Sequence, residues 1–325
     1  MTTPMTTPMT EPVYHPAFDG NGFDPARAEG AGLADTRRHM WTAVRLGWQV
    51  ESNWTDPLLF FIYTVAKPVA SLLLLVFMVQ IVGGTGAAGE AVRTFVVLGS
   101  ALWAMLMAGI AGPAWSVLDD RERYRMLKYL YVSPATFLLV LVGRGVSKLA
   151  VGAMGTVIAL LFAVVVLGLR VDLAAVNWPM LTLTLLLGLP PILALGIGLA
   201  AICLQTRQES WSYPEAFAGA LFLVSGVVFP LSILPAPVQV IGLINPVTWW
   251  VAGVRGAILP TGASSIGGAS SLWTTLTGTQ VPDGAMTIAV LLLTGAVSTL
   301  AATALFRVSE RRARERGLLD LTTGS

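Results

Sequence analysis

Long apolar segments constrain this chain more than any other feature of its sequence. A helix that crosses the hydrocarbon core of a bilayer needs about 20 predominantly apolar residues. Six segments reach this length: roughly residues 58–82, 92–118, 145–168, 179–203, 216–234 and 285–306. Charged residues make up only 12% of the chain, against about 25% in soluble domains. The sequence therefore predicts an all-α polytopic membrane protein with six transmembrane helices.

The distribution of Lys and Arg predicts the orientation of these spans. Cytoplasmic loops of membrane proteins carry an excess of both residues. With both termini in the cytoplasm, the cytoplasmic segments hold basic clusters within 37–45, 121–128 and 307–316, whereas the outside segments hold Arg170 and Arg255. We therefore expect both termini on the cytoplasmic side of a bacterial inner membrane.

Both ends of the chain are polar. Residues 1–35 are rich in Thr, Pro and Gly, contain the near-repeat MTTPMTTPMT and lack the apolar region of a signal peptide. This composition predicts a disordered cytoplasmic tail. A second, short cytoplasmic tail is expected at 317–325.

An amphipathic helix is expected at residues 36–54, just before the first span. One side of it carries Trp41 and Trp48, and another carries Arg38 and Arg45. Such a helix lies in the membrane interface with its tryptophans at the level of the lipid headgroups. The alternative is an ordinary juxtamembrane helix that contacts no partner.

The densest charged run in the chain, residues 119–134, lies between the second and third spans. Asp119 and Asp120 suit the N-terminus of a helix, where backbone N–H groups are unpaired, and Pro134 marks a break after it. The pattern predicts a short cytoplasmic helix with one apolar edge. A solvated loop with positive-inside arginines is the alternative.

Some cations stand next to or within apolar segments, among them Arg144, Lys148 and Lys67. Arg144 and Lys148 are spaced as i, i+4 near a cytoplasmic end, and we expect them to reach toward lipid headgroups. Lys67, beside Pro68, lies roughly 14 Å into the first span. A lysine at that depth is costly, so it either faces a pathway or subunit seam, or it reaches the interface from a tilted helix.

Prolines interrupt the apolar segment that follows the fifth span. Pro235 and Pro237 force a turn, and Asn245-Pro246 makes a second break. Residues 235–260 are therefore expected to form a re-entrant pair of short helices that dips into the outer leaflet. Irregular backbone at this depth must pack on protein or line a cavity. The alternative is a pair of interfacial helices anchored by Trp249 and Trp250.

Other motifs exclude functions. Residues 84–89 match GxGxxG but follow a span rather than a strand, and no GxxxxGK[ST] motif occurs, so the chain has no P-loop of its own. We therefore expect no cofactor in this chain. The lone Cys203 cannot form an intrachain disulfide, and we expect no metal site. A net charge of +2 indicates no nucleic-acid partner. No catalytic constellation is present, so the chain is expected not to be an enzyme.

With these features the sequence resembles the permease subunits of type-2 ABC exporters, which include daunorubicin-resistance-type and polysaccharide-export-type proteins. Glu122-Arg123 followed by Val132-Ser133-Pro134 is similar to the segment that couples such permeases to their ATPase. The run SGVVFPLSILPAPVQVIGLINPVTWWVAGVRG (225–256) is similar to the family's fifth span, re-entrant helices and Asn-Pro break. The resemblance covers about residues 36–316. Tyr124-Arg125 and Lys128 depart from the family, which often has Gly-Thr and an acid there.

The resemblance implies a role for each of these segments. Two permease copies, identical or paralogous, form the pathway in contact with membrane lipids, and two ATPase subunits bind below. The ATPase-coupling residues would be Asp119, Asp120, Arg121, Glu122, Arg123, Tyr124, Val132, Ser133 and Pro134, assisted by the interface helix with Arg38, Trp41, Arg45 and Trp48. The outer gate would comprise Phe229, Pro230, Pro235, Pro237, Asn245, Pro246 and Trp249, and Lys67 is a pathway candidate.

The function expected from the sequence is ATP-driven export of an amphiphilic drug, lipid or glycan-linked substrate. Few charges in the spans favour an amphiphile, whereas tryptophans such as Trp103, Trp115 and Trp211 could stack on sugars. The alternative is an ion-coupled secondary transporter.

Overall fold

The computed structural model describes residues 33–52, 57–83, 87–132, 136–169, 172–206, 211–259, 264–268 and 270–315. Within these ranges every regular element is a helix: α2 (Leu33–Ser52), α3 (Pro57–Gly83), α4 (Ala87–Leu118), the π-helical η1 (Asp119–Arg123), α5 (Leu127–Val132), α6 (Phe137–Val165), α7 (Trp178–Gln205), α8 (Ser212–Val224), the 3₁₀ helix η2 (Leu231–Ile233), α9 (Ala236–Ile244), α10 (Pro246–Ile258), α11 (Leu272–Thr277) and α12 (Gly284–Glu315). The all-α prediction is confirmed. The expected tail at 317–325 and nearly all of that at 1–35 lie outside the described residues.

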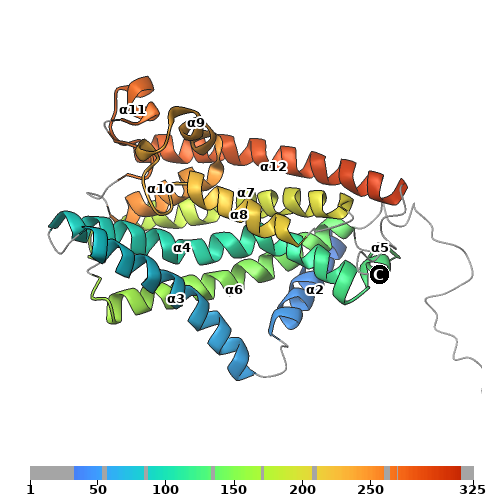
Figure 1. Ribbon diagram of the computed structural model, residues 1–325. Helices are drawn as coiled ribbons and strands as arrows, with labels where there is room; N and C mark the ends of the chain where they lie inside the picture. The colour runs from blue at the N-terminus through green and yellow to red at the C-terminus, as the bar shows by residue number, and fades with distance from the viewer. Residues whose placement is uncertain are drawn as a thin grey trace, which may run out of the picture.

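Five helices, α3, α4, α6, α7 and α12, are long and apolar enough to cross a bilayer. Helices α4, α6, α7 and α12 run roughly along one direction and α3 crosses them obliquely, with α9, α10 and α11 gathered at one end of the bundle and α2 and α5 at the other (Figure 1). We call these the α10 end and the η1 end, because η1 directly precedes α5. The separation agrees with the predicted placement of the coupling segment and the re-entrant pair on opposite sides of the membrane.

The expected fifth span differs from its predicted extent of 216–234. Helix α8 ends at Val224 and has 13 residues, too few to cross a bilayer alone. Ser225 Oγ donates to the carbonyl of Leu221 at 2.5 Å, and Gly226 adopts φ +68°, a left-handed conformation that continues no helix. The chain then reaches η2 through turns and Pro230.

The predicted break between α9 and α10 is confirmed. The two helices meet at an angle of 81°. Asn245 makes the corner, because its side-chain oxygen accepts from the Val247 N–H at 3.1 Å and its amide donates to Ser225 Oγ at 3.0 Å. Pro246 then occupies the first turn of α10, where no N–H is needed.

The expected start of the third span at residue 145 is wrong. Helix α6 runs unbroken from Phe137 to Val165. Arg144 does not end the apolar segment, because it is buried inside the helix bundle and carries a partner there.

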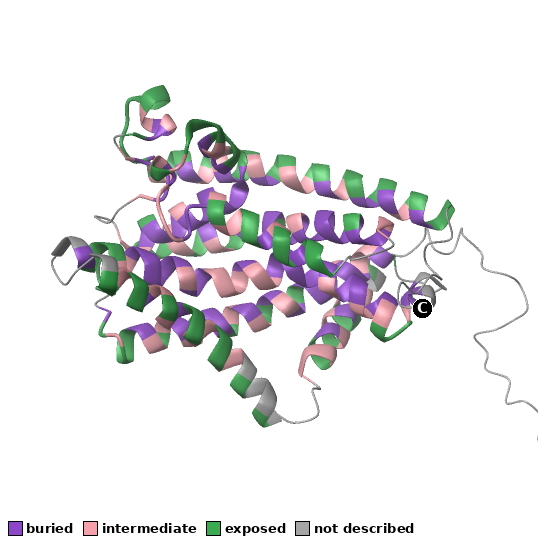
Figure 2. Cartoon of the chain, in the orientation of Figure 1, coloured by how far each residue is buried: buried purple, intermediate pink, exposed green. Residues whose placement is uncertain are grey.

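The long helices differ in how far neighbouring helices cover them. In the most apolar 18-residue windows, 72% of α4 and 61% of α7 is buried, against 11% of α3 and 17% of α12. Figure 2 shows exposed residues along α3 and along one side of α12. Helices α4 and α7 therefore form the centre of the bundle, and α3 and α12 present apolar faces to lipid or to another chain.

Candidate functional site

The charged segment after α4 continues that helix instead of starting a new one. Residues Asp119–Arg123 form a π-helical turn in which the N–H of Tyr124 donates to the carbonyl of Asp119 at 2.8 Å. The prediction that Asp119 and Asp120 stand at a helix N-terminus is therefore wrong. The expected single helix over 119–134 is also wrong, because Arg125 has φ +50° and α5 starts separately at Leu127. Ser133 and Pro134 lie outside the described residues.

A buried ion pair joins this π turn to α6. Arg144 pairs with the carboxylate of Asp120, and both side chains are at most 4% exposed. The expectation that Arg144 reaches toward headgroups is therefore wrong. Sequence spacing could not reveal the pair, since 24 residues separate its members.

Arg121 joins the same turn to α7. Its Nη1 donates to the carbonyls of Cys203 and Thr206, each at 3.0 Å, and its Nε bonds Glu122 at 2.9 Å. Carbonyls near the end of a helix lack intrahelical partners, so a cation there satisfies them. The π turn is thus fixed to both α6 and α7.

Next to these buried anchors, the turn has an exposed surface. Arg123, Tyr124 and Arg125 are exposed, whereas Leu127 and Leu130 of α5 are buried in the apolar cluster at the η1 end. Val132 is the last residue of α5. The exposed charged and aromatic side chains therefore lie on a turn that moves with the spans, because its buried residues Asp120 and Arg121 are bonded to α6 and α7.

Helix α2 packs closely on α6 at the same end. Ser147 Oγ donates to the carbonyl of Val44 at 2.7 Å, and a Cβ at Gly47 would lie 3.0 Å from the Cα of Arg144. Lys148 pairs with Glu51 of α2, so the expectation that this lysine reaches toward headgroups is also wrong.

The opposite side of α2 is exposed. Trp41 and Trp48 are 69% and 39% exposed, and Arg38 and Arg45 are exposed as well. Both tryptophan side chains are accessible from outside the protein, and their contact with lipid headgroups stays a prediction. Helix α2 is docked on α6, and its contact with a partner stays a prediction.

A buried arginine at the α10 end was not predicted as a site residue. Arg255 is 2% exposed and donates to the carbonyls of Gly226 (2.5 Å), Val227 and Phe95 (2.9 Å), and to Ser265 Oγ (2.6 Å). Its guanidinium carbon lies 3.5 Å from the centroid of the Phe95 ring. We call these five residues the Arg255 cluster. A lone cation inside the apolar run was the signal that could have identified it.

The expected gate residues near this cluster differ in how deeply they are buried. Asn245, Pro246 and Trp249 are buried, Phe229 and Pro230 are half-buried, and Pro235 and Pro237 are exposed. Trp249 donates to the Leu243 carbonyl at 2.7 Å, and Trp250 is fully buried. Interfacial helices anchored by these two tryptophans are thereby excluded, because both rings lie inside the protein.

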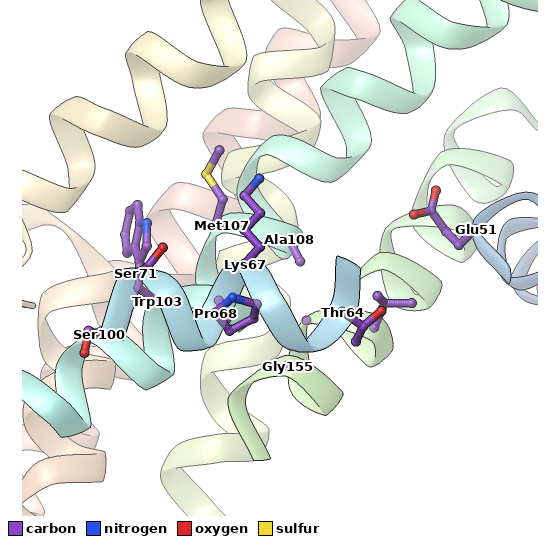
Figure 3. A pocket seen from close by; sticks show the side chains of 13 residues that line it. Glu51, Thr64, Lys67, Pro68, Ser71, Ser100, Trp103, Met107, Ala108 and Gly155 are labelled. Atoms are coloured by element: carbon purple, nitrogen blue, oxygen red, sulfur yellow. The ribbon is translucent and has the colours of Figure 1, made fainter. Parts of the chain in front are cut away.

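A cleft of about 560 Å³ lies between α3, α4 and α6. Figure 3 shows Lys67 and Pro68 of α3 among its lining side chains, with Trp103 and Met107 from α4. Glu51 also borders the cleft but lies beyond Thr64, away from Lys67 (Figure 3). Lys67 itself is exposed.

Comparison with known proteins was made by family and by individual sequence. No curated protein matched the chain. The sequence model of the ABC-2 type transporter family matches residues 43–259, about two thirds of the chain. That match includes α3 to α10 with the π turn, the residues that line the cleft and, except for Ser265, the Arg255 cluster. This multi-pass membrane protein therefore belongs to the ABC-2 type transporter family.

Proposed function

We propose that the chain is the permease subunit of an ATP-driven exporter that moves an amphiphilic drug, lipid or glycan-linked substrate outward across a bacterial inner membrane. Two copies, or one copy and a paralogue, would form the pathway. Two separate ATPase subunits would bind ATP and Mg²⁺ at the η1 end, which would be cytoplasmic together with both termini.

One observation carries this proposal: an exposed turn is joined to two helices by buried polar contacts, and through one of them to a third helix. Asp120 connects the turn to α6 and Arg121 connects it to α7. Lys148 of α6 in turn connects to Glu51 of α2. Displacement of the exposed Arg123 and Tyr124 by a partner would therefore displace α2, α4, α6 and α7 together.

The opposite end supplies the second part of the mechanism. The Arg255 cluster joins α10 to Phe95 of α4 and to the turn after α8. Movement at the η1 end would therefore reach the re-entrant pair through α4. Export requires that the nucleotide-bound ATPase bind one arrangement of these helices more tightly than the other.

The test is ATP hydrolysis by this chain co-purified in lipid with its ATPase. We expect Tyr124→Ala combined with Arg123→Glu to abolish co-purification, because both side chains lie on the exposed turn. Arg311→Ala is the matched control, since it removes an exposed cation from the part of α12 that lies at the η1 end. Equal loss in both variants, or no ATPase bound to the wild type, would count against the proposal.

An ion-coupled secondary transporter is the second candidate, and the exposed Lys67 within an apolar cleft favours it. Intramembrane ionisable residues mark ion pathways in such proteins. A gradient-driven flux in liposomes without ATPase, lost in Lys67→Gln, would support this candidate over ATP-driven export.

A further inference from the structure

The cleft has the shape of a ligand site that opens toward the bilayer. At the α10 end, Leu72 and Val76 of α3 pack against Val97 and Ala101 of α4. The half of α3 that begins at Pro57 splays away from the other long helices (Figure 1). The volume of about 560 Å³ falls in the range of small-molecule sites. A lipid-soluble molecule could enter between α3 and the bundle without first crossing into water.

The walls of the cleft are mainly apolar. Pro68 of α3 faces Gly155 of α6, where a Cβ would lie 3.2 Å from the Pro68 ring. Met107 and Ala108 contribute from α4. Trp103 is fixed by a tilted contact with Phe222, whose ring centroid lies 4.7 Å away. Such walls suit the chain or ring system of an amphiphile.

The charges around the cleft do not cancel. Glu51 is paired with Lys148. Lys67 has no ion-pair or hydrogen-bond partner among the described residues. One positive charge therefore remains in an apolar site, where an unpaired cation is costly and an anion would be bound strongly.

We propose that this cleft binds an amphiphile with a single anionic group, such as a phosphate or carboxylate, which Lys67 contacts while Trp103 and Met107 cover the apolar part. The assignment of this ligand as cargo rests on the exporter function proposed above. The site can be tested without any ATPase.

The probe is dodecyl phosphate brominated on its chain, added to the full chain in nanodiscs of phosphatidylcholine. Bromine quenches tryptophan fluorescence on contact, and the Trp103→Phe variant isolates the contribution of Trp103. The matched probes carry the same brominated chain on a maltoside or a trimethylammonium headgroup. We expect saturable quenching by the phosphate and much weaker quenching by the other two.

Three substitutions connect this binding to the cleft. Lys67→Gln should weaken dodecyl phosphate binding about tenfold or more, the loss expected of a charge-assisted contact, and Lys67→Arg should retain it. Ser71→Phe should also weaken binding, because Ser71 is an exposed residue of α3 that lines the cleft. Arg93→Gln is the control, since this cation of α4 lies outside the cleft beside Glu90. Equal binding of all three headgroups, or binding unchanged in Lys67→Gln, would overturn the proposal.

The proposal excludes a second copy of the chain as the occupant of the cleft. In Lys67→Cys, rapid disulfide cross-linking of two copies, with no labelling by a soluble maleimide, would place Lys67 in a subunit seam and overturn the amphiphile site. Phosphatidylglycerol added to the discs distinguishes two sources of the anion. If phosphatidylglycerol competes with dodecyl phosphate, the ligand of the site is a bilayer lipid. If it does not compete, the ligand is an anionic amphiphile other than a bilayer lipid.

Failure of the site and failure of the proposed function give different results. If dodecyl phosphate binds through Lys67 but ATP hydrolysis never responds to an amphiphile, the exporter function fails and the site stands. If hydrolysis responds to a neutral amphiphile and Lys67→Gln changes nothing, the exporter function stands and the site fails.

Discussion

The two ends of the helix bundle each contain a buried arginine, and the two are stabilised in different ways. Arg144 at the η1 end faces the carboxylate of Asp120. Arg255 at the α10 end has no acidic partner among the described residues and bonds three carbonyls, one hydroxyl and an aromatic face. Arg144 and Asp120 together carry no net charge. Arg255 is a single positive charge, bonded mainly to backbone carbonyls of several segments.

This difference bears on which arginine can be replaced. Replacing both members of a buried ion pair by apolar residues of similar volume is often neutral, because desolvation of the two charges offsets their attraction. Arg255 has no single partner that could be removed with it, because it bonds three carbonyls and one hydroxyl from different segments. The ion pair at the η1 end can therefore be exchanged as a unit, whereas the α10 end depends on the guanidinium of Arg255.

The largest effect is expected from Arg255→Met. The substitution leaves four buried acceptors without their donor, and each unsatisfied polar group costs about 1–3 kcal/mol. We expect a loss of more than about 4 kcal/mol or no folded protein, measured as free energy of unfolding in mixed micelles titrated with SDS.

Arg255→Lys sharpens this test. An ammonium has three donors on a flexible stem and cannot reproduce the planar guanidinium fork. We expect the lysine variant to stay closer to Arg255→Met than to the wild type. Wild-type stability in Arg255→Lys would show that charge alone suffices, and the contrast with Arg144 would then lose its basis.

The second largest effect concerns the ion pair. Asp120→Ala leaves Arg144 buried without its partner and should cost about 3–5 kcal/mol. The double variant Asp120→Leu with Arg144→Met should recover most of that stability, because no uncompensated charge remains. The same unfolding titration measures both.

The double variant also tests transmission. We expect it to bind the ATPase yet to lose the response of ATP hydrolysis to added amphiphile, because α6 is no longer joined to the π turn. If the double variant were as unstable as Asp120→Ala, the pair would stabilise the fold by more than the mutual neutralisation of its two charges.

The sequence predicted the parts of this architecture that depend on local pattern. Hydropathy located α3, α4, α7 and α12, and Asn245-Pro246 located the bend, because a side-chain cap and a missing N–H act within a few residues. The end of α8 was misjudged because Gly226 and Pro230 interrupt a run whose hydropathy does not change.

Long-range pairing could not be predicted in this way. The drop in hydropathy after Leu118 was interpreted as a helix end, although the helix continues into η1. Arg144 and Lys148 were assigned to lipid because their partners, Asp120 and Glu51, are on other helices. The depth of Lys67 in the first span drew attention to this residue, but the cleft beside it depends on how α3 packs against α4 and α6.

A third prediction tests the α10 end without removing a charge. A Cβ at Gly99 of α4 would overlap the Val227 carbonyl and Nη2 of Arg255. Gly99→Ala should therefore displace the Arg255 cluster and cost about 1–3 kcal/mol in the unfolding titration. Gly219→Ala in α8 is the control, because nothing lies within 4 Å of its Cβ position, and alanine should be neutral or slightly stabilising there. Equal effects of the two substitutions would argue against close packing at Gly99.

The smallest effect is expected at the seam between α2 and α6. Ser147→Ala removes the hydrogen bond to the Val44 carbonyl, and interhelical hydrogen bonds in membrane proteins contribute about 0.6 kcal/mol on average. Gly47→Leu should instead separate α2 from α6, because even a Cβ there would lie 2.8 Å from Ser147 Oγ. The measurements are the unfolding free energy and maleimide labelling of a Val44→Cys variant, which should stay slow with Ser147→Ala and become fast with Gly47→Leu. If both substitutions left labelling slow, the Lys148–Glu51 pair would hold α2 without close packing, and charge pairing would dominate the η1 end even where small residues meet.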